Sequence, residues 1–246
     1  MIEVRNLHKR FDEQPVLDNV SFRIENGESV AIIGRSGCGK SVLLKHLIGL
    51  LKPDAGDVLI DGENIVPMDE RQLLNVRRKF GMVFQGAALF DSMTVEENVA
   101  FALRRNTHLP EAEIVRRVAR VLAVVDLSGT ENKNSAELSG GMRKRVGLAR
   151  AIIYEPQIVL YDEPTTGLDP IVADSIDKLI MRVHGRLKVT TVVVTHDMRT
   201  ARRVSQRILM IHDSKIYASG TPDEFFASQD PVVRQFIDGV ADAEKN

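Results

Sequence analysis

A glycine-rich stretch that ends in a lysine and a serine is the part of this sequence best suited to chemistry. It lies between an apolar run, Ser29 to Ile33, and a helical pattern, Val42 to Ile48, and it reads Gly34-Arg35-Ser36-Gly37-Cys38-Gly39-Lys40-Ser41. Glycines allow successive backbone N–H groups to surround one anion, and the positive end of the following helix points at the same place. The pattern therefore predicts a phosphate-binding loop, and the alternative is an ordinary glycine turn.

Two carboxylates later in the chain suit the metal ion and the attacking water that a phosphate-binding loop would use. Lys40 offers a mobile cation to the β- and γ-phosphates of a nucleotide, and the Ser41 hydroxyl is a ligand for Mg²⁺. Asp162 follows a buried strand, Ile158 to Tyr161, and its carboxylate suits the same hard cation. Glu163 leaves the opposite side of the backbone, so we expect it to position and polarise the attacking water. The alternative is an acidic strand end with no such role.

A histidine follows the next predicted strand of the sheet. His196 comes after the β-branched run Thr190 to Val194. Ligands of parallel α/β sheets bind beyond the carboxyl ends of the strands, where Gly34, Asp162 and His196 all lie. We therefore expect the three to converge, with His196 bonded to the γ-phosphate or to the attacking water. A lone histidine is more often structural, which is the alternative.

A second predicted helix start also favours an anion. Ser139, Gly140 and Gly141 combine a serine N-cap with two glycines that permit close backbone approach. One chain with two phosphate-binding termini and no second nucleotide fold suggests a head-to-tail homodimer. ATP would then lie between the phosphate-binding loop of one copy and Ser139 of the other.

Composition limits the other possibilities. The chain has 246 residues, 43% of them hydrophobic, and a net charge of −1, so no global basic field attracts nucleic acid. Cys38 is the single cysteine, which excludes an intrachain disulfide and fits a reducing compartment. The N-terminal residues alternate as a strand rather than as a signal peptide, and no apolar run is long enough to span a membrane. A membrane role would come through a partner.

Strands that alternate with helices predict an α/β fold with a mostly parallel central sheet covered on both faces. A helix-only block from about residue 86 to residue 155 lies between two of the predicted strands and is expected to be an inserted helical subdomain. Thr94 and Glu97 are spaced as a capping box at its first helix. We expect one ATPase domain over residues 1–230 and a short C-terminal tail, 231–246.

Taken in order, these motifs resemble the ATP-binding subunit of an ABC transporter. The resemblance runs from Ile2 to about Phe226 and includes Thr165-Thr166-Gly167-Leu168-Asp169. It implies a P-loop ATPase fold with an N-terminal antiparallel β part, and ATP and Mg²⁺ as cofactors. It further implies that Phe11 stacks on adenine, that Gln85 contacts Mg²⁺ and water and reports to a transmembrane partner, and that Asp169 crosses the dimer interface. Arg35, Ser36 and Cys38 occupy the variable positions of the loop.

Some stretches resemble the phospholipid-trafficking branch of that family, the maintenance-of-lipid-asymmetry (Mla) ATPases. Met142 stands where most members have glutamine, and the stretches are Phe84 to Val95, Thr107 to Glu113 and Val233 to Gly239. The branch implies a transmembrane permease, an MCE periplasmic lipid-binding protein and a small STAS-domain protein as partners. It also implies a peripheral location, through the permease, at the cytoplasmic face of the inner membrane.

Other functions remain as alternatives. An importer or exporter of another cargo would carry the same ATPase motifs. A ribosome-acting or DNA-repair ABC ATPase usually has tandem nucleotide domains or a long coiled coil, and this chain has neither. An iron–sulfur-assembly ATPase has a similar size, although the stretch from Gly86 to Phe101 disfavours it. The basic residues Arg143, Lys144, Arg145 and Arg150 form either a solvated face or a dimer or nucleotide contact.

Overall fold

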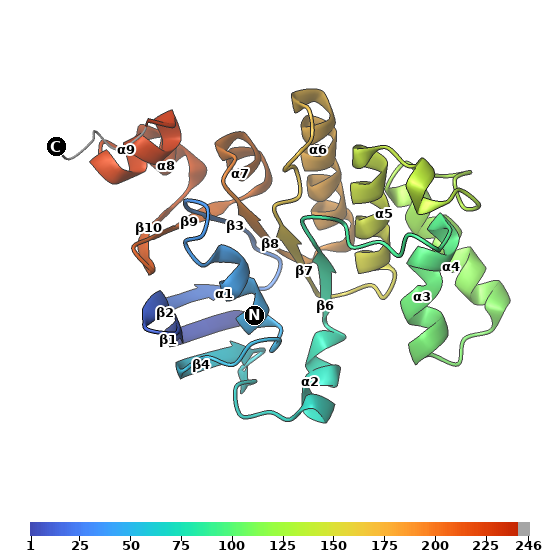
Figure 1. Ribbon diagram of the computed structural model, residues 1–246, viewed down its shortest axis with the longest axis horizontal. Coiled ribbons are helices and arrows are strands. Elements are labelled where there is room, and N and C mark those ends of the chain that lie inside the picture. Colours follow the sequence, from blue (N-terminus) through green and yellow to red (C-terminus); the bar gives the residue numbers. More distant parts are fainter. Residues whose placement is uncertain (241–246) are drawn as a thin grey trace.

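The computed structural model describes residues 1–240 of the chain. Two sheets lie next to each other with helices packed around them, and a group of helices projects at one end (Figure 1). Within the described residues, no helix has both the length and the apolar character needed to cross a membrane.

The smaller sheet is antiparallel and has the strand order β2-β1-β4-β5. Its strands are β1 (Ile2–Phe11), β2 (Gln14–Ile24), β4 (Ala55–Ile60) and β5 (Glu63–Asn64). We expect a turn over residues 11–15 from the sequence Phe-Asp-Glu-Gln-Pro, but Phe11 pairs with Gln14 in a tight hairpin. The turn is shorter than predicted because Asp12, a residue type that tolerates the left-handed region, adopts a φ of 52°.

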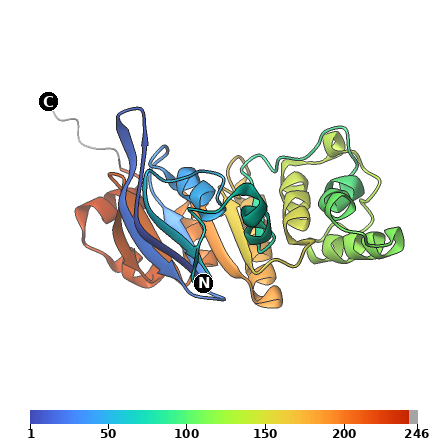
Figure 2. The same ribbon diagram turned by 90° about the horizontal axis from the view of Figure 1, so that it is seen from below.

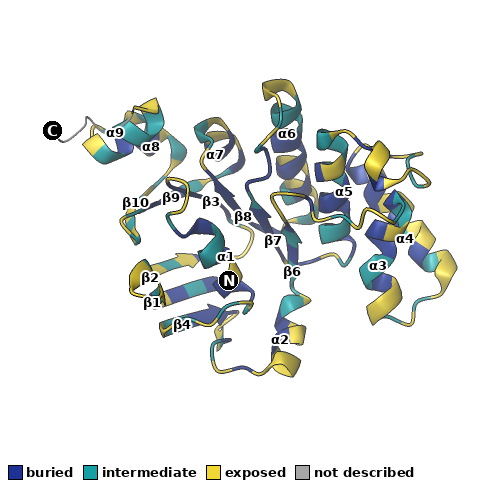
Figure 3. Ribbon diagram, in the orientation of Figure 1, coloured by how far each residue is buried: buried dark blue, intermediate teal, exposed yellow. Residues whose placement is uncertain are grey.

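The larger sheet has the order β10-β9-β3-β8-β7-β6. Its strands are β3 (Ser29–Ile33), β6 (Phe80–Val83), β7 (Ile158–Asp162), β8 (Thr190–Thr195), β9 (Arg207–His212) and β10 (Lys215–Gly220). Pairing is parallel from β9 to β6, and β10 is antiparallel. Every residue of β3 and β8 is buried (Figure 3), as expected for strands covered on both faces. The predicted mostly parallel sheet is confirmed.

Alternate residues of the central strand separate two apolar cores. Ile32 packs with α1 and the antiparallel sheet, whereas Ala31 and Ile33 pack with three C-terminal helices. The helices concerned are α1 (Lys40–Leu47), α7 (Met198–Val204), α8 (Pro222–Ala227) and α9 (Pro231–Asp238). Val233 of α9 is 3% exposed in the second core, so residues 231–238 of the predicted tail pack against the sheet. Residues 241–246 lie outside the described residues.

The helical block is inserted in the chain between β6 and β7, which are neighbours in the sheet, and it projects at one end of the molecule (Figure 2). It contains α3 (Val95–Asn106), α4 (Glu111–Val124), the 3₁₀ turn η1 (Ser135–Glu137) and α5 (Gly140–Ile152). The predicted capping box of Thr94 and Glu97 is present at the start of α3. Asn98, buried in this block, donates to the carbonyl oxygens of Phe90, Met93 and Thr94 and so fixes the loop that leads into α3.

Two helices differ from the sequence expectation. The apolar pattern predicts a helix over residues 174–183, whereas the helix α6 (Pro170–Leu187) begins four residues earlier, because Asp169 caps it and Pro170 occupies its first turn. The helix α2 (Glu70–Arg77) was not predicted, since only Leu73 and Val76 are buried and the apolar period is weak. The Asp69 and Gln72 capping box was the signal that could have found it.

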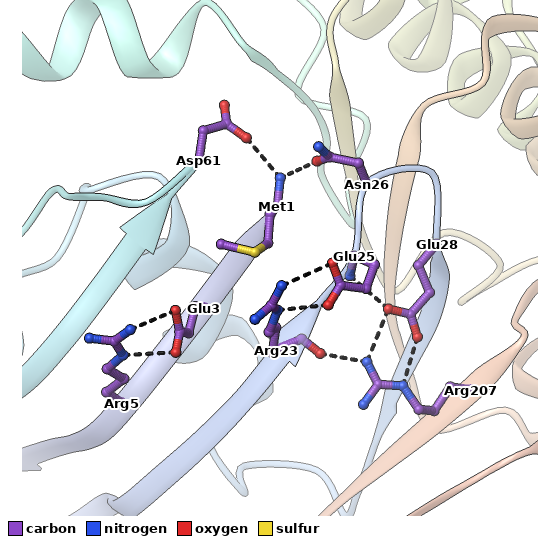
Figure 4. A network of polar contacts seen from close by, with 9 residues as sticks. All are labelled: Met1, Glu3, Arg5, Arg23, Glu25, Asn26, Glu28, Asp61 and Arg207. Carbon is purple, nitrogen blue, oxygen red and sulfur yellow. Dashed lines mark hydrogen bonds and ion pairs between the residues drawn. The ribbon is translucent and has the colours of Figure 1, made fainter.

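Polar contacts hold the two sheets together at the end where β2 meets β3 (Figure 4). Arg207 of β9 donates to both carboxylate oxygens of Glu28, at 2.7 and 3.1 Å, and to the carbonyl oxygen of Arg23 in β2. The amino group of Met1 contacts Asp61 at 2.8 Å and also bonds Asn26. These bonds fix the strand that carries the phosphate-binding loop relative to the antiparallel sheet.

A buried carboxylate lies where α6 packs against α7. Asp177 is 3% exposed, its Oδ2 accepts from Thr200 Oγ1 at 3.2 Å, and its Oδ1 has no partner among the described residues. Thr200 in turn is 3.2 Å from Thr165 Oγ1. Burial raises the pKa of Asp177 to about 6, the charge of Asp197 acts in the same direction, and the Thr200 bond opposes both.

Asp177→Asn should therefore be more favourable for stability, relative to the wild type, at pH 8 than at pH 5. The folded-state pKa lies above the value for an unfolded chain, so the wild type loses stability as the pH rises from about 4 through 6. Asparagine has no proton to lose, and about half of the pH-dependent loss in the wild type has already occurred at pH 5. The difference in unfolding free energy between variant and wild type should therefore shift by about 1.5 kcal/mol between the two pH values. Chemical denaturation at each pH measures that shift.

Asp174→Asn serves as the matched control for this experiment. Asp174 is on the same helix but forms ion pairs with Arg203 and Lys178, so its replacement should lower stability at both pH values. A difference for Asp177→Asn that does not change with pH would contradict the prediction.

Candidate functional site

Three neighbouring parallel strands end at the phosphate-binding loop. Ile33 pairs with Thr195, and Asp162 pairs with Val194, so β3, β8 and β7 reach the same edge of the sheet. The convergence that the sequence predicted for Gly34, Asp162 and His196 therefore exists in the fold.

The loop folds tightly around the start of α1. Gly39 is the N-cap with a φ of 98°, and a Cβ there would lie 2.8 Å from the carbonyl oxygen of Val16, so a side chain would displace β2. Lys40 is 6% exposed, and its Nζ donates to the carbonyl oxygens of Gly34, at 2.8 Å, and Arg35, at 3.0 Å. The ammonium group is thus held across the loop, where it can exchange carbonyl oxygens for phosphate oxygens.

The two carboxylates at the end of β7 have different partners. Ser41 Oγ donates to Asp162 Oδ1 at 2.9 Å, while Glu163 Oε1 lies 3.8 Å from Lys40 Nζ. Burial raises the pKa of Asp162, although the hydrogen bond from Ser41 and the charge of Lys40 act in the opposite direction. A nearby cation would stabilise the ionised form of such a buried carboxylate.

The side chain of Glu163 is fixed from several sides. Its Oε2 accepts from Thr166 Oγ1 at 2.9 Å and from His196 Nδ1 at 2.8 Å. Because a carboxylate only accepts, Nδ1 of His196 carries the proton of this bond, and Nε2 is left for a second partner. Glu163 is only 8% exposed and its φ is 48°, which is uncommon for a residue other than glycine.

A cavity of about 500 Å³ opens over these groups. The lining comes from the loop and α1 on one side and from three other segments on the other; its residues are Ser36, Gly37, Gly39, Lys40, Ser41, Val42, Gln85, Glu163, Thr166 and His196. The fold thus brings Gln85, which was singled out only by resemblance, to the same space as the lysine and the carboxylate. Thr166 is a member of the site that sequence reasoning quoted in a motif without assigning a role.

Cys38 differs from its neighbours in the loop. Its side chain is half-buried and packs against the core around α1 rather than lining the cavity. Burial raises the pKa of the Cys38 thiol, which keeps the thiol protonated at neutral pH.

The five predicted nucleotide contacts that lie outside the loop do not line the cavity in one copy of the chain; they are Phe11, Ser139, Gly140, Gly141 and Asp169. Phe11 lies beside the tip of the β1–β2 hairpin, 45% exposed, with Lys9 Nζ 5.5 Å from its ring centroid. Ser139 is exposed at the start of α5, where its Oγ accepts from the N–H of Met142 at 3.3 Å. In a single copy these residues lie away from the loop. Their contacts with the nucleotide therefore stay predictions.

The second of the two glycines after Ser139 meets the start of α6. A Cβ on Gly141 would lie 2.6 Å from Val172 Cγ1, so glycine is needed for α5 and α6 to approach this closely. Asp169 Oδ1 accepts from the N–H groups of Ile171 and Val172, each at 3.0 Å, and thereby caps α6. The packing of α5 on α6 thus explains a glycine at position 141, and the capping of α6 explains an aspartate at position 169.

The basic residues of α5 do not form one patch. Arg143 donates to the carbonyl oxygen of Leu138 at 2.6 Å, and Arg145 bonds Asp126 at 2.9 Å. Arg150 donates to the carbonyl oxygens of two loop alanines, and Lys144 is 7% exposed. A solvated basic face was therefore the wrong interpretation for Lys144, and each side chain fastens a different segment of the chain.

Together, the loop, its lysine and serine, and the carboxylate pair at the edge of a parallel sheet define a nucleotide-binding ATPase of the P-loop class. A family model described as ABC transporter matches residues 17–166. The chain belongs to the ABC transporter family, as an ATP-binding cassette that hydrolyses ATP.

Similar proteins differ in how much of their own length this chain covers. A Mycobacterium tuberculosis protein named probable ribonucleotide transport ATP-binding protein mkl is 43% identical over 238 residues, which are 97% of this chain and 66% of that protein. The intermembrane phospholipid transport system ATP-binding protein MlaF of Escherichia coli K12 is 40% identical over 242 residues, which are 98% of this chain and 90% of that protein.

A solved structure is similar over nearly its whole length. It is the dimeric, post-hydrolysis cassette MJ0796 bound to ADP and Pi, with a TM-score of 0.82 and 33% identity. The match covers 90% of this chain and 99% of that chain.

Proposed function

We propose that this chain is the ATP-hydrolysing motor of a membrane transporter that moves phospholipid between bacterial membranes. The proposal of phospholipid as cargo rests on the similarity to the phospholipid-transport protein MlaF, which extends over 98% of this chain and 90% of MlaF. The mycobacterial relative is named for ribonucleotide transport, and only 66% of it is covered, so that cargo is the second candidate.

The residues of the cavity have distinct proposed roles. The N–H groups of Gly34 to Ser41, together with Lys40, bind the β- and γ-phosphates of ATP. Glu163 orients the attacking water and accepts its proton. His196 holds that carboxylate through Nδ1, and its Nε2 donates to the γ-phosphate when the ring carries a second proton there. The hydrogen bonds to Glu163 that are already in place reduce the reorganisation that catalysis would need.

A Mg²⁺ ion fits the oxygen atoms beside the loop. Ser41 Oγ and Asp162 Oδ1 lie 2.9 Å apart, which is the spacing of two neighbouring ligands on an octahedral ion with bonds of about 2.0–2.1 Å. Ser41 and Asp162 would hold the ion, directly or through water, and Gln85 lines the same cavity. When bound, Mg²⁺ supplies positive charge to the β- and γ-phosphate oxygens.

The remaining nucleotide contacts would come from a second copy. Ser139, Gly140 and Gly141 lie outside the cavity of their own chain and are accessible at the start of α5. A head-to-tail dimer would present them to the γ-phosphate bound by the partner loop and would place Asp169 at the interface, while Phe11 stacks on adenine. The similar cassette MJ0796 was solved as a dimer, which supports this arrangement.

A permease helix is the proposed occupant of an apolar groove of about 580 Å³ beside the loop of Gln85. Leu74, Phe84 and Phe90 line it, with 56%, 39% and 42% of their surfaces exposed. Phe84 precedes Gln85 directly, so a helix in this groove would lie against the loop that reaches the nucleotide cavity. The chain would thereby be held at the cytoplasmic face of the inner membrane.

The other proposed partners follow from the phospholipid branch. An MCE lipid-binding protein would receive or deliver lipid in the periplasm, and a small STAS-domain protein would bind the ATPase. The division into an ATPase domain, 1–230, with an inserted helical subdomain and a short tail belongs to the same proposal.

Glu163→Gln should bind ATP normally and hydrolyse it at least about 10²-fold more slowly, because the amide cannot accept the proton of the attacking water. ATP affinity and single-turnover hydrolysis measure the two effects. Glu155→Gln is the matched control, since Glu155 lies before the other end of β7 and pairs with Arg120. Turnover near that of the wild type would remove Glu163 from the proposed role.

Ser139→Arg should prevent ATP-dependent dimerisation without changing ATP affinity, because a long cation would occupy the position of the partner's γ-phosphate. Light scattering in the slow Glu163→Gln background measures the dimer. Ser128→Arg, also exposed in the helical block, is the control. A dimer that persists in Ser139→Arg would contradict the head-to-tail arrangement.

Purification of the chain with its membrane partner tests the cargo. The expected result is co-purification with a permease and recovery of bound phospholipid by mass spectrometry. A complex that carries ribonucleotide, or association with iron–sulfur scaffold proteins in place of a permease, would overturn the phospholipid assignment.

A further inference from the structure

Lys144 reaches the catalytic loops from the helical block. It lies in the second turn of α5, is 7% exposed, and its Nζ donates to the carbonyl oxygens of Gln85 and, at 3.3 Å, of Glu163. Gln85 follows β6 and Glu163 follows β7, so one ammonium group joins the two loops that leave these neighbouring strands. The sequence showed only a basic residue in a basic stretch.

This ammonium group is held in place by charge as well as by hydrogen bonds. Burial lowers the pKa of Lys144, and the negative charges of Glu163 and Asp162 oppose that change. Removing the side chain would take this donor from both carbonyl oxygens and would leave that of Glu163 with only the longer bond from the N–H of Thr166, at 3.4 Å. The position is therefore sensitive to substitution in a way that an exposed lysine is not.

Glu163 needs such support at its main chain. Its φ of 48° is a conformation that non-glycine residues retain only where surrounding contacts enforce it. Its N–H donates to the carbonyl oxygen of Val194 at 2.9 Å, and its own carbonyl oxygen accepts from Lys144 and, at 3.4 Å, from the N–H of Thr166. The first contact comes from the neighbouring strand, and the second comes from the helical block.

We propose that Lys144 is a positioning residue for ATP hydrolysis, which fixes the main chain of Glu163 against the loop of Gln85 and so makes the placement of the Glu163 carboxylate depend on the helical block. The proposal rests on the role proposed for Glu163. A displacement of the Gln85 loop by a helix in the adjoining groove would move one of the two carbonyl groups that Lys144 holds. Lys144 thereby links partner binding to the geometry of the reacting carboxylate.

The test compares Lys144→Met with Arg145→Met in whichever wild-type preparation hydrolyses ATP, the chain alone or its complex with the membrane partner. Arg145 is the next residue on α5, but it bonds Asp126 and Val125 instead of the catalytic loops. Lys144→Met should lower kcat about 10-fold or more and change KM for ATP less than about 3-fold, since misplacing a catalytic group acts on the reaction step. Arg145→Met should keep kcat within about twofold of wild type, with both variants compared at equal folded fraction.

A double variant separates positioning from general destabilisation. In the Glu163→Gln background, Lys144→Met should slow single-turnover hydrolysis by no more than about twofold, because a residue that acts through Glu163 has no further effect once that carboxylate is gone. A further 10-fold loss there, or wild-type kcat for Lys144→Met alone, overturns the proposal. If Lys144→Met does not fold, Lys144→Gln, which keeps a donor but no charge, is held to the same criteria. The Glu163→Gln variant alone tests the role proposed for Glu163, so a failure of that role can be told apart from a failure of the role proposed for Lys144.

Discussion

Asp162 and Glu163 place two carboxylates side by side at the end of a strand whose other residues are buried. Each needs a different form of compensation, because one position suits a metal ion and the other suits a proton acceptor. Ser41 bonds the first, while Thr166, His196 and the ammonium of Lys40 surround the second. The phosphate-binding loop, the β8 end and the helical block are all arranged around this charge pair.

Much of this arrangement follows from patterns that are local in sequence. The loop from Gly34 to Ser41, the strand before it and the acids after β7 are each determined by residues within a few positions, and parallel pairing then places their ends together. The capping box of Thr94 and Glu97 could be found for the same reason. The mostly parallel sheet followed from the alternation of strands and helices.

Other features depend on contacts between distant segments, and no local pattern indicates them. Lys144 looks like part of a solvated basic stretch until α5 packs against β6 and carries it to Gln85 and Glu163. Asp177 follows an ordinary helical pattern, and its burial depends on how α7 crosses α6. The order of strands in the sheet, which decides these neighbours, is likewise a property of the whole chain.

The order of strands also has a consequence for how the protein is made. Ala31 of β3 pairs with Val193 on one side and with Ile208 on the other, so the strand before the phosphate-binding loop is synthesised well before its sheet neighbours. Pairings so distant in sequence form slowly, because a long loop must close first. On the ribosome, the emerging chain would therefore hold an apolar strand and a nucleotide loop that has no sheet to support it. Nucleotide binding would therefore mark the arrival of β8 and β9 in the sheet rather than the folding of the segments that precede them.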